Sequence, residues 1–317
     1  MSNRERYEKF CDSQKDVSVF SQSWWLDVVC GSSNWDVALV EKGGQIKASL
    51  PYYKRNVKGS IYLQRPPITP FLGPSIVYPE GQTYSKRLSW EKEVLDTLFE
   101  QLPEFVFFEQ HFSPGFKNWL PLYWKGFQQT TRYTYVIDAK GFDDYLAELL
   151  PSTRRRRVKK ANALGIKVYE SDDIETFFAL NKKTFARQGV KVPYSWELVK
   201  NLYSEGKKRS SVRLFFASLE GKVIAAGFYV FDKHCVYYLM GGIDPEVTDV
   251  GAMDLIQLKG IELALNSERQ FDFEGSMMPS IEKYFRSFGA IQRPYFEISK
   301  TNSKLLKLKR LVKDFIK

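Results

Sequence analysis

Apolar residues recur along this chain with two periods, one typical of helices and the other of strands. Apolar positions spaced by three and four residues predict helices at 20–29, 85–102, 142–150, 152–165, 172–188, 195–205, 250–265 and 279–289. Alternating or short apolar runs predict strands at 37–41, 45–55, 60–63, 75–78, 105–109, 133–137, 166–169, 212–219, 223–231, 234–240, 271–274 and 294–299. This mixed order of helices and strands indicates an α/β or α+β fold.

Tight turns connect several of the predicted strands. Residues 42–44 (Lys-Gly-Gly) join two strands into a hairpin, and residues 220–222 and 232–233 join the strands of residues 212–240 into an antiparallel meander. The segment 138–141 separates two stretches with similar element order. A length of 317 residues favours two domains. We therefore expect domains at 1–140 and 141–317, and the likeness of 38–48 to 217–226 suggests a duplication.

The composition of the chain excludes several classes of protein and favours a folded, basic one. Hydrophobic residues make up 44% of the chain and aromatic residues 15%, enough for packed cores and too much for a disordered chain. The formal charge of +10 favours anionic partners such as nucleic acid, nucleotide phosphates or an anionic membrane surface. Three scattered cysteines and two histidines argue against a disulfide framework and a metal site. With no apolar leader and no apolar window long enough for a membrane span, we expect a cytoplasmic protein without an integral membrane segment.

Residues 271–290 combine a strand, a tight turn and a short helix. Apolar and acidic residues alternate from Phe271 to Glu274, Gly275 ends the strand, and Pro279 begins a helix that is apolar on one side. Asp272 and Glu274 would then share one strand face. Two carboxylates beside such a turn can hold an amine or accept its proton. They can equally be solvated charges at a sheet edge.

A run of cations opens the predicted helix 152–165. The four residues from Arg154 to Arg157 sit at the positive end of the helix dipole, which is unfavourable without a bound anion, and Arg154, Arg155, Arg157 and the later Lys160 are the candidate phosphate contacts. A bound diphosphate, tRNA backbone or lipid headgroup would compensate it. The run therefore predicts a phosphate-binding site, with a solvated basic face as the alternative.

Four further features are candidates for function. Arg65 lies in a proline-rich loop and can contact a phosphate or pack over an aromatic ring. Tyr238, on the last strand of the meander, can donate a proton to a leaving group or fill the core. Ser276, with no histidine nearby in sequence, is a substrate-binding candidate rather than a nucleophile. The tail 303–317 is a basic amphipathic helix that either packs on the body or touches anionic lipid.

Three segments together resemble the Fem-type branch of the GNAT acyltransferases, which includes the FemABX peptidyltransferases and other bacterial tandem-GNAT proteins. They are the basic helix and following strand of 150–168, the Tyr-Tyr-Leu-Met-Gly-Gly strand of 237–242, and the strand–turn–helix of 271–290. The resemblance is good over 140–300 and thin before residue 140. It implies two tandem GNAT-like domains, each with a mixed, mostly antiparallel sheet flanked by helices.

The resemblance also implies an activity, the transfer of an acyl or aminoacyl group from a carrier to an amine. In Fem-type enzymes the donor is aminoacyl-tRNA and the acceptor is a peptidoglycan precursor, whereas ordinary GNAT enzymes use acetyl-CoA. The family's Lys or Arg near the reacting carbonyl corresponds to Arg286, which would stabilise an oxyanion or else pair with Glu282. Asp272 or Glu274 would accept or relay the proton of the amine.

One segment departs from the acetyl-CoA pattern. Ordinary GNAT enzymes bind the diphosphate in a glycine-rich turn after the central strand, whereas residues 245–252 retain one glycine and add Glu246 and Asp249. We therefore expect an N-acyltransferase acting on a phosphate-bearing cell-envelope precursor or similar amine. The alternatives are an acetyl-CoA-dependent N-acetyltransferase and a non-catalytic RNA-binding or scaffold protein. No cofactor is implied beyond acyl-CoA or aminoacyl-tRNA as donor substrate.

Overall fold

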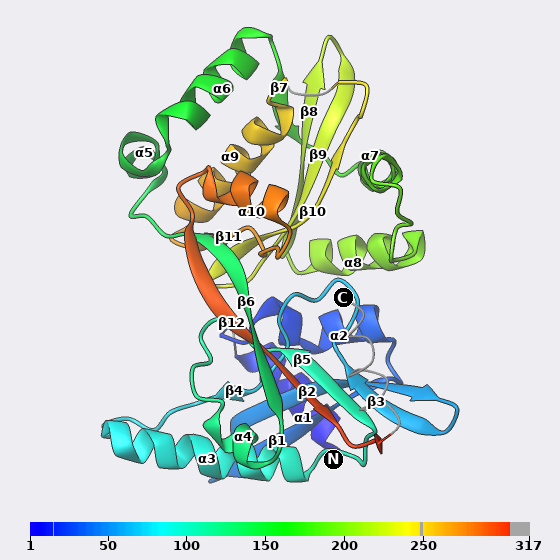
Figure 1. Ribbon diagram of the computed structural model, residues 1–317, viewed down its shortest axis with the longest axis vertical. Helices are drawn as coiled ribbons and strands as arrows, with labels where there is room; N and C mark the ends of the chain where they lie inside the picture. The colour runs from blue at the N-terminus through cyan, green and yellow to red at the C-terminus, as the bar shows by residue number, and fades with distance from the viewer. Residues whose placement is uncertain (15, 248–249, 305–317) are drawn as a thin grey trace. The chain divides into compact units, whose positions relative to one another are not determined.

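The computed structural model describes residues 1–14, 16–247 and 250–304, and its contacts divide the chain into two units (Figure 1). The first unit contains 1–132 and the chain from 294 onward, and the second contains 133–293. Strands β6 (Gln128–Ile137) and β12 (Ile291–Thr301) each run from one unit into the other. The domain boundary predicted near residue 140 stays a prediction, and most of the predicted tail helix lies outside the described residues.

The first unit is a sheet with helices packed on it. Its strands are β1 (Trp35–Lys42), β2 (Gln45–Val57), β3 (Ser60–Gln64), β4 (Ser75–Ile76) and β5 (Phe107–His111), with β12 beside β5. Its helices are α1 (Asn3–Ser13), α2 (Ser23–Cys30), α3 (Tyr84–Glu100) and α4 (Leu120–Trp124). The apolar side of α3, with Val94, Leu95 and Leu98 fully buried, packs against the sheet around Phe108 and forms the core.

The second unit carries most of the predicted functional residues. Its strand order is β6-β11-β10-β9-β8-β7, formed by β7 (Lys167–Glu170), β8 (Val212–Leu219), β9 (Lys222–Phe231), β10 (Cys235–Ile243) and β11 (Gln270–Asp272) in addition to β6. Its helices are α5 (Phe142–Asp144), a π-helical turn (Tyr145–Leu149), α6 (Ser152–Ala163), α7 (Ile174–Arg187), α8 (Trp196–Lys208), α9 (Ala252–Leu265) and α10 (Pro279–Arg286).

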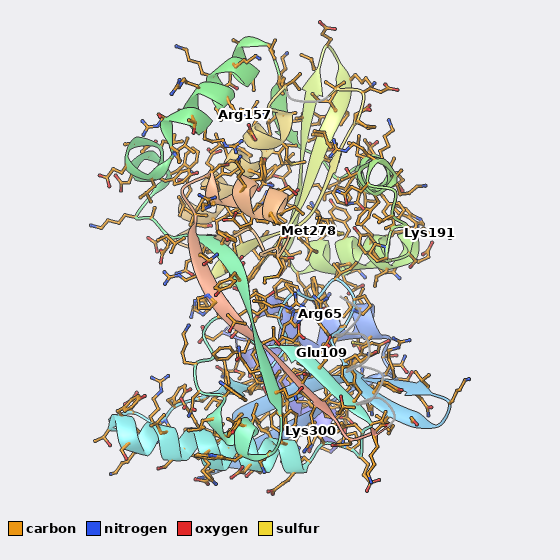
Figure 2. The ribbon with its side chains drawn as sticks, in the orientation of Figure 1. Arg65, Glu109, Arg157, Lys191, Met278 and Lys300 are labelled. Carbon is orange, nitrogen blue, oxygen red and sulfur yellow. The ribbon has the colours of Figure 1, made fainter. Side chains whose placement is uncertain are left out.

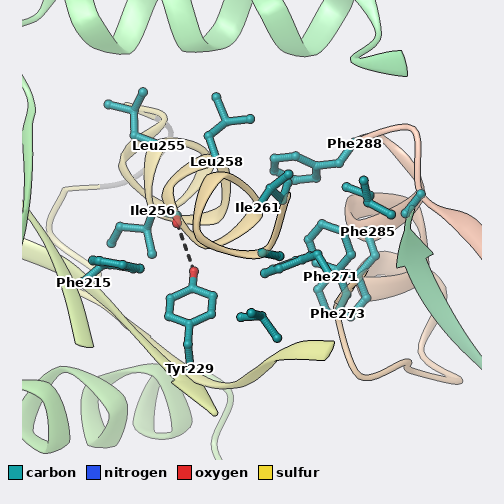
Figure 3. Close-up of a cluster of buried hydrophobic side chains, with 14 of the residues drawn as sticks. Phe215, Tyr229, Leu255, Ile256, Leu258, Ile261, Phe271, Phe273, Phe285 and Phe288 are labelled. Carbon is teal, nitrogen blue, oxygen red and sulfur yellow. Dashed lines mark hydrogen bonds between the residues drawn. The ribbon is translucent and has the colours of Figure 1, made fainter. Parts of the chain in front are cut away.

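Helices cover both faces of this second sheet (Figure 1). Adjacent residues of β9 point to opposite faces, as in any strand. Phe228 therefore packs with Phe177 of α7, while Tyr229 packs under α9 and donates a hydrogen bond to the Ile256 carbonyl over 3.0 Å (Figure 3). Phe271, Phe273, Phe285 and Phe288 extend the α9 side of the core toward α10 (Figure 3).

The structure confirms the predicted fold class and the antiparallel pairings. Strands β8, β9 and β10 form the expected meander, and β1 and β2 form the expected hairpin. Two expectations need correction. The predicted strand 271–274 ends at Asp272, because Glu274 has a φ of 59° that no strand accommodates. The predicted helix 142–150 is a short α-helix followed by a π-helical turn.

Helix α1 was missed because its sequence gives no amphipathic signal. Tyr7 is its one residue classed as buried, and the rest of the helix is polar or partly exposed. Its start is fixed locally by a capping box, in which Ser2 and Glu5 satisfy each other's backbone amides. Such a helix depends on the packing of Tyr7 against Trp35 of β1, which the local pattern does not report.

Substitution of Gly242 by alanine is expected to destabilise the second unit. A Cβ atom there would lie 2.5 Å from the backbone nitrogen of Asn181 and 2.6 Å from the carbonyl carbon of Leu180, so α7 must move. Overpacking of this kind costs about 1–3 kcal/mol. Urea unfolding of Gly242→Ala and of the control Gly115→Ala, whose new Cβ meets only Ser113 Oγ at 3.7 Å, checks the prediction. Equal midpoints for the two variants would contradict it.

Candidate functional site

The candidate site lies where β10 and β11 separate. The two strands pair in parallel at only three positions, the last being Tyr237 with Asp272. Beyond that point β11 ends, while β10 continues to Ile243 with an irregularity between Tyr238 and Met240. Residues 273–278 therefore leave the sheet beside Tyr238. This separation brings Asp272, Glu274 and Tyr238, predicted from two short stretches of sequence, to one end of the unit.

Asp272 is a buried carboxylate. Only 4% of the residue is exposed, and its Oδ1 accepts hydrogen bonds from the Thr134 hydroxyl of β6 and from the Glu274 amide, the latter over 2.7 Å. Burial raises the pKa of the Asp272 carboxyl to about 6, although both hydrogen bonds act in the opposite direction. Of the two interpretations left open by the sequence, solvation at a sheet edge is therefore excluded for Asp272.

Glu274 has a different environment from Asp272, although the alternating pattern suggested a shared face. It follows the end of β11, is only partly buried, and lies close enough to Tyr238 for its charge to raise the pKa of that phenol. Burial is the largest cause of the raised Tyr238 pKa, and Tyr194 raises it more than Glu274 does. Glu274 is thus the less buried carboxylate of this pair, although its Oε1 is buried.

Tyr238 packs against the core while its hydroxyl faces β10 and α9. The ring lies 5.6 Å from that of Tyr229, and the hydroxyl is 3.7 Å from Met253 Sδ. A Cβ on Gly241 would lie 1.9 Å from the same hydroxyl, so a glycine is required for Tyr238 to fold back over its own strand. Tyr238 therefore fills part of the core with its ring and also places its hydroxyl group near Glu274.

Arg286 ends α10 and is exposed. Its Nε donates to Glu282 Oε1 over 2.7 Å, the i, i+4 pair that the sequence offered as one alternative. The Tyr135 hydroxyl of β6 donates to the same oxygen over 3.1 Å, and Gln292 donates to Tyr135 over 2.6 Å. The side chain of Arg286 nevertheless remains 64% exposed, so its guanidinium keeps donors for a ligand.

Two cations of the basic run are held by the protein itself. Arg154 and Arg157 both bind the buried carboxylate of Asp254 in the first turn of α9, at 2.5 and 2.9 Å. Arg154 is only 6% exposed, stacks over Phe288 at 4.3 Å, and donates to the Ser287 hydroxyl. The unfavourable position of these cations at a helix start is thus compensated by a carboxylate of the same chain. Figure 2 marks Arg157 on α6.

The remaining candidates have separate surroundings. Arg155 donates to the Leu150 and Ala147 carbonyls over 2.9 and 3.1 Å, and Lys160 is exposed on α6. The Ser276 hydroxyl accepts from the Met278 amide over 3.0 Å at the turn before α10, which Figure 2 marks at Met278. Arg65 belongs to the first unit, where it is exposed and makes one long contact of 3.5 Å with the Thr69 carbonyl. These residues therefore form no single cluster with Asp272 and Glu274 within the second unit.

Sequence reasoning missed Thr134, Tyr135 and Asp254. Thr134 and Tyr135 are consecutive residues of β6. The Thr134 hydroxyl donates a hydrogen bond to Asp272, at the start of the turn after β11. The Tyr135 hydroxyl donates one to Glu282, the partner of Arg286. Asp254 was missed because the rest of its helix is mostly apolar. A carboxylate in the first turn of a helix, in a chain that also contains a basic run, could have indicated an ion pair. All three act through partners more than 90 residues away in the chain, which local patterns do not register.

The described residues offer no metal site and no membrane-spanning helix. No group of three His, Cys, Asp or Glu side chains is arranged to hold a metal ion among them. Within the same part of the chain, every helix is too short or too polar to cross a bilayer.

Comparison with known proteins identifies one domain and the fold. Residues 152–286 match the family model described as "Acetyltransferase (GNAT) domain". No curated protein sequence matches the chain. The solved structure of FemX is similar at 14% identity, covering 92% of this chain and 95% of its own, with a TM-score of 0.67.

Two lysylphosphatidylglycerol synthetase structures are also similar to this chain. L-PGS from Bacillus licheniformis is 11% identical, with 97% and 95% of the two chains covered and a TM-score of 0.57. The C-terminal domain of a putative lysylphosphatidylglycerol synthetase from Agrobacterium fabrum is 10% identical, with 95% and 92% covered and a TM-score of 0.55. At these identities the structural matches describe the fold.

Residues 152–286, within the second unit, are therefore identified as a GNAT acetyltransferase domain. The chain as a whole has the fold of FemX. The resemblance to Fem-type tandem GNAT proteins noted in the sequence is confirmed at the level of the fold.

Removal of the Asp254 carboxylate is expected to destabilise the second unit strongly. Arg154, whose side chain is 7% exposed, would keep its charge without this partner. Stripping one member of a buried ion pair costs about 3–5 kcal/mol. Denaturant unfolding of Asp254→Ala measures this, and Glu170→Ala is the control because its partner Arg213 is 42% exposed and such pairs contribute about 0–1 kcal/mol. Similar losses in both variants would contradict the assignment.

The raised pKa of Asp272 predicts a particular pH dependence of stability. Between about pH 4 and pH 6 the folded state holds a proton that the unfolded state has released. The contribution of Asp272 to the free energy of unfolding therefore falls as pH rises through this window, by roughly 3 kcal/mol at most. Asp272→Asn should remove this fall, whereas the exposed control Asp143→Asn should keep it. A parallel profile for wild type and Asp272→Asn would contradict the prediction.

Proposed function

We propose that this protein transfers an aminoacyl group from aminoacyl-tRNA to the amine or hydroxyl of a phosphate-bearing cell-envelope acceptor. The observation that carries the choice of donor is the start of α9. In ordinary GNAT enzymes the helix after the central strand binds the diphosphate of acetyl-CoA with its first amides. In this chain the first turn of that helix carries Asp254, already bound by Arg154 and Arg157 of α6.

Packing at the same place supports this choice of donor. A Cβ atom on Gly251, the residue before α9, would lie 2.9 Å from the Ala161 side chain and 3.5 Å from the Arg157 carbonyl. Helix α6 therefore lies directly against the beginning of α9. A diphosphate bound there in the ordinary mode would have to displace α6 and would meet the carboxylate of Asp254. Acetyl-CoA is accordingly the less favoured donor.

The residues around the end of β11 support the following mechanism. The acceptor nitrogen or oxygen attacks the ester carbonyl of the aminoacyl donor, and the bond from that carbonyl carbon to the carrier oxygen breaks. Glu274 accepts the proton of the attacking group and returns it to the departing carrier oxygen. Arg286 stabilises the negative charge on the carbonyl oxygen between these steps.

The acceptor class rests on charge and on the proteins that share the fold. FemX and the two lysylphosphatidylglycerol synthetases point to envelope precursors and anionic lipid as acceptors. The chain's net charge of +10 suits either acceptor as well as tRNA. Arg155, Lys160 and Arg65 are proposed to contact phosphate, together with Arg157, which is 44% exposed. We propose a cytoplasmic location, where tRNA is available, with peripheral contact to an anionic membrane.

A donor test separates the alternatives. Purified protein is incubated with radiolabelled aminoacyl-tRNA or acetyl-CoA, and with phosphatidylglycerol vesicles or a nucleotide-linked peptidoglycan precursor. Label is expected in the acceptor with aminoacyl-tRNA and not with acetyl-CoA. Transfer from acetyl-CoA alone would overturn the proposal, and salt-sensitive RNA binding without any product would indicate a scaffold protein.

Arg286→Ala is expected to lower the transfer rate about 10²–10³-fold, because one donor to the oxyanion is lost. Arg293→Ala is the matched control, an exposed arginine on the neighbouring strand β12. Arg286→Lys, which keeps the charge, should recover part of the rate. If Arg286→Ala and Arg293→Ala transfer label at the same rate, Arg286 has no part in the mechanism.

A further inference from the structure

We propose that Thr134 and Asp272 are positioning residues of the transfer site, which hold the turn after β11 so that Glu274 is presented to the substrate. This inference rests on the proposed function in taking Glu274 as the proton acceptor. Neither Thr134 nor Asp272 would itself touch the substrate. Their role would be exerted through the backbone of residues 273–275.

The first support is a closed set of hydrogen bonds centred on Thr134. The Thr134 hydroxyl donates to Asp272 Oδ1 and accepts from the Gly275 amide over 3.0 Å. The same Asp272 oxygen accepts from the Glu274 amide over 2.7 Å. The Asp272 carboxylate thus accepts the hydrogen bond of the Glu274 amide, and the Thr134 hydroxyl accepts that of the Gly275 amide. Because the Thr134 hydroxyl has a single proton, its donation to Asp272 fixes the direction of both bonds.

The second support is the conformation that these bonds maintain. Glu274 has a φ of 59°, in the left-handed region that residues with a side chain seldom adopt. Gly275 then passes so close to β6 that a Cβ atom would lie 1.8 Å from the Tyr133 carbonyl oxygen. A disfavoured backbone conformation persists where surrounding contacts determine it, and such residues concentrate at functional sites.

The third support is the division of side chains along the turn. Phe273 is 1% exposed, and its ring lies 4.9 Å from that of Phe285 and 5.3 Å from that of Phe288. Its amide donates to the Tyr135 carbonyl of β6 over 3.0 Å. With Phe273 fixed in the core, the residue that follows it has a left-handed backbone, and its carboxylate lies near Tyr238. The turn is therefore held in two ways: its backbone is hydrogen-bonded to β6, and the Phe273 side chain is packed in the core.

Burial excludes the simpler alternative in which Asp272 is itself the base. Thr134 is fully buried and Asp272 is 4% exposed, so an acceptor amine cannot reach either without disrupting the sheet. The titratable groups around Asp272 are Cys235 and Tyr237 on β10 and Glu274 in the turn. With no cation among them, the hydrogen bonds from Thr134 and Glu274 are what favours the charged carboxylate.

Thr134→Val, which removes the hydroxyl and keeps the shape, tests the proposal without requiring a substrate. Amide hydrogen exchange measured by NMR should accelerate at Gly275 at least tenfold, and the pKa of Asp272 should rise above that of the wild type. Thr134→Ser should restore both values. Thr130→Val is the matched control, an exposed threonine on the same strand. Unchanged exchange at Gly275 in a folded Thr134→Val protein would overturn the proposal.

Transfer kinetics test the functional half of the inference. With the substrate pair found in the donor test, Thr134→Val should lower kcat about tenfold, with little change in KM, and Thr134→Ser should restore it. Faster exchange at Gly275 with an unchanged kcat would overturn the positioning role. If the wild type transfers nothing, the proposed function fails, while the exchange result still decides whether Thr134 holds the turn.

Discussion

The hydrogen bonds of the buried Asp272 carboxylate are the constraint on which the candidate site depends. They join three elements that come together only in the folded second unit: β6 through Thr134, β11 through Asp272 itself, and the following turn through Glu274. A carboxylate in such a place is costly unless hydrogen-bonded, and its raised pKa reflects that cost. The benefit is a turn with a defined backbone where β10 and β11 part.

A second constraint keeps α10, and with it Arg286, in place. Asp254 of α9 binds Arg154 and Arg157 of α6, and it also accepts from the Tyr284 hydroxyl of α10 over 3.1 Å. Three helices are thus joined through one carboxylate. This cluster also accounts for the basic run, since part of its charge is used inside the protein. The same arrangement occupies the start of α9, so the residues that stabilise the unit are also those on which the proposed choice of donor rests.

Strand β6 contacts both the turn that carries Glu274 and the partner of Arg286. Thr134 and Tyr135 are neighbours in sequence, and strand geometry sends their side chains in opposite directions. One secures the turn that carries Glu274, and the other bonds to Glu282, the partner of Arg286. Two neighbouring residues of one strand can therefore help to fix both the proposed proton acceptor and the proposed oxyanion donor. Both are placed by elements of one unit.

Local patterns were sufficient for the elements that bury one face by themselves. The meander of β8, β9 and β10 was predicted because its apolar runs are long and its turns contain Gly221 and the pair Asp232-Lys233. The strand–turn–helix around Gly275 was also found, since Phe271, Phe273, Phe285 and Phe288 keep the periods of their elements. The contacts of the polar residues at the site could not be predicted from local patterns, because their partners are distant in sequence.

The sequence by itself determined the fold class and the antiparallel pairings and indicated the short stretches of the candidate site, because these depend on the spacing of apolar residues and on turn residues. Only the tertiary structure decided what each charged group does. Asp272 is buried and Glu274 is partly exposed although they are two residues apart, since β11 ends between them. Arg154 is an internal ion-pair partner while Arg286 stays largely exposed. The physical reason is that the energy of a charge depends on its burial and on its partners, and both are set by distant segments of the chain.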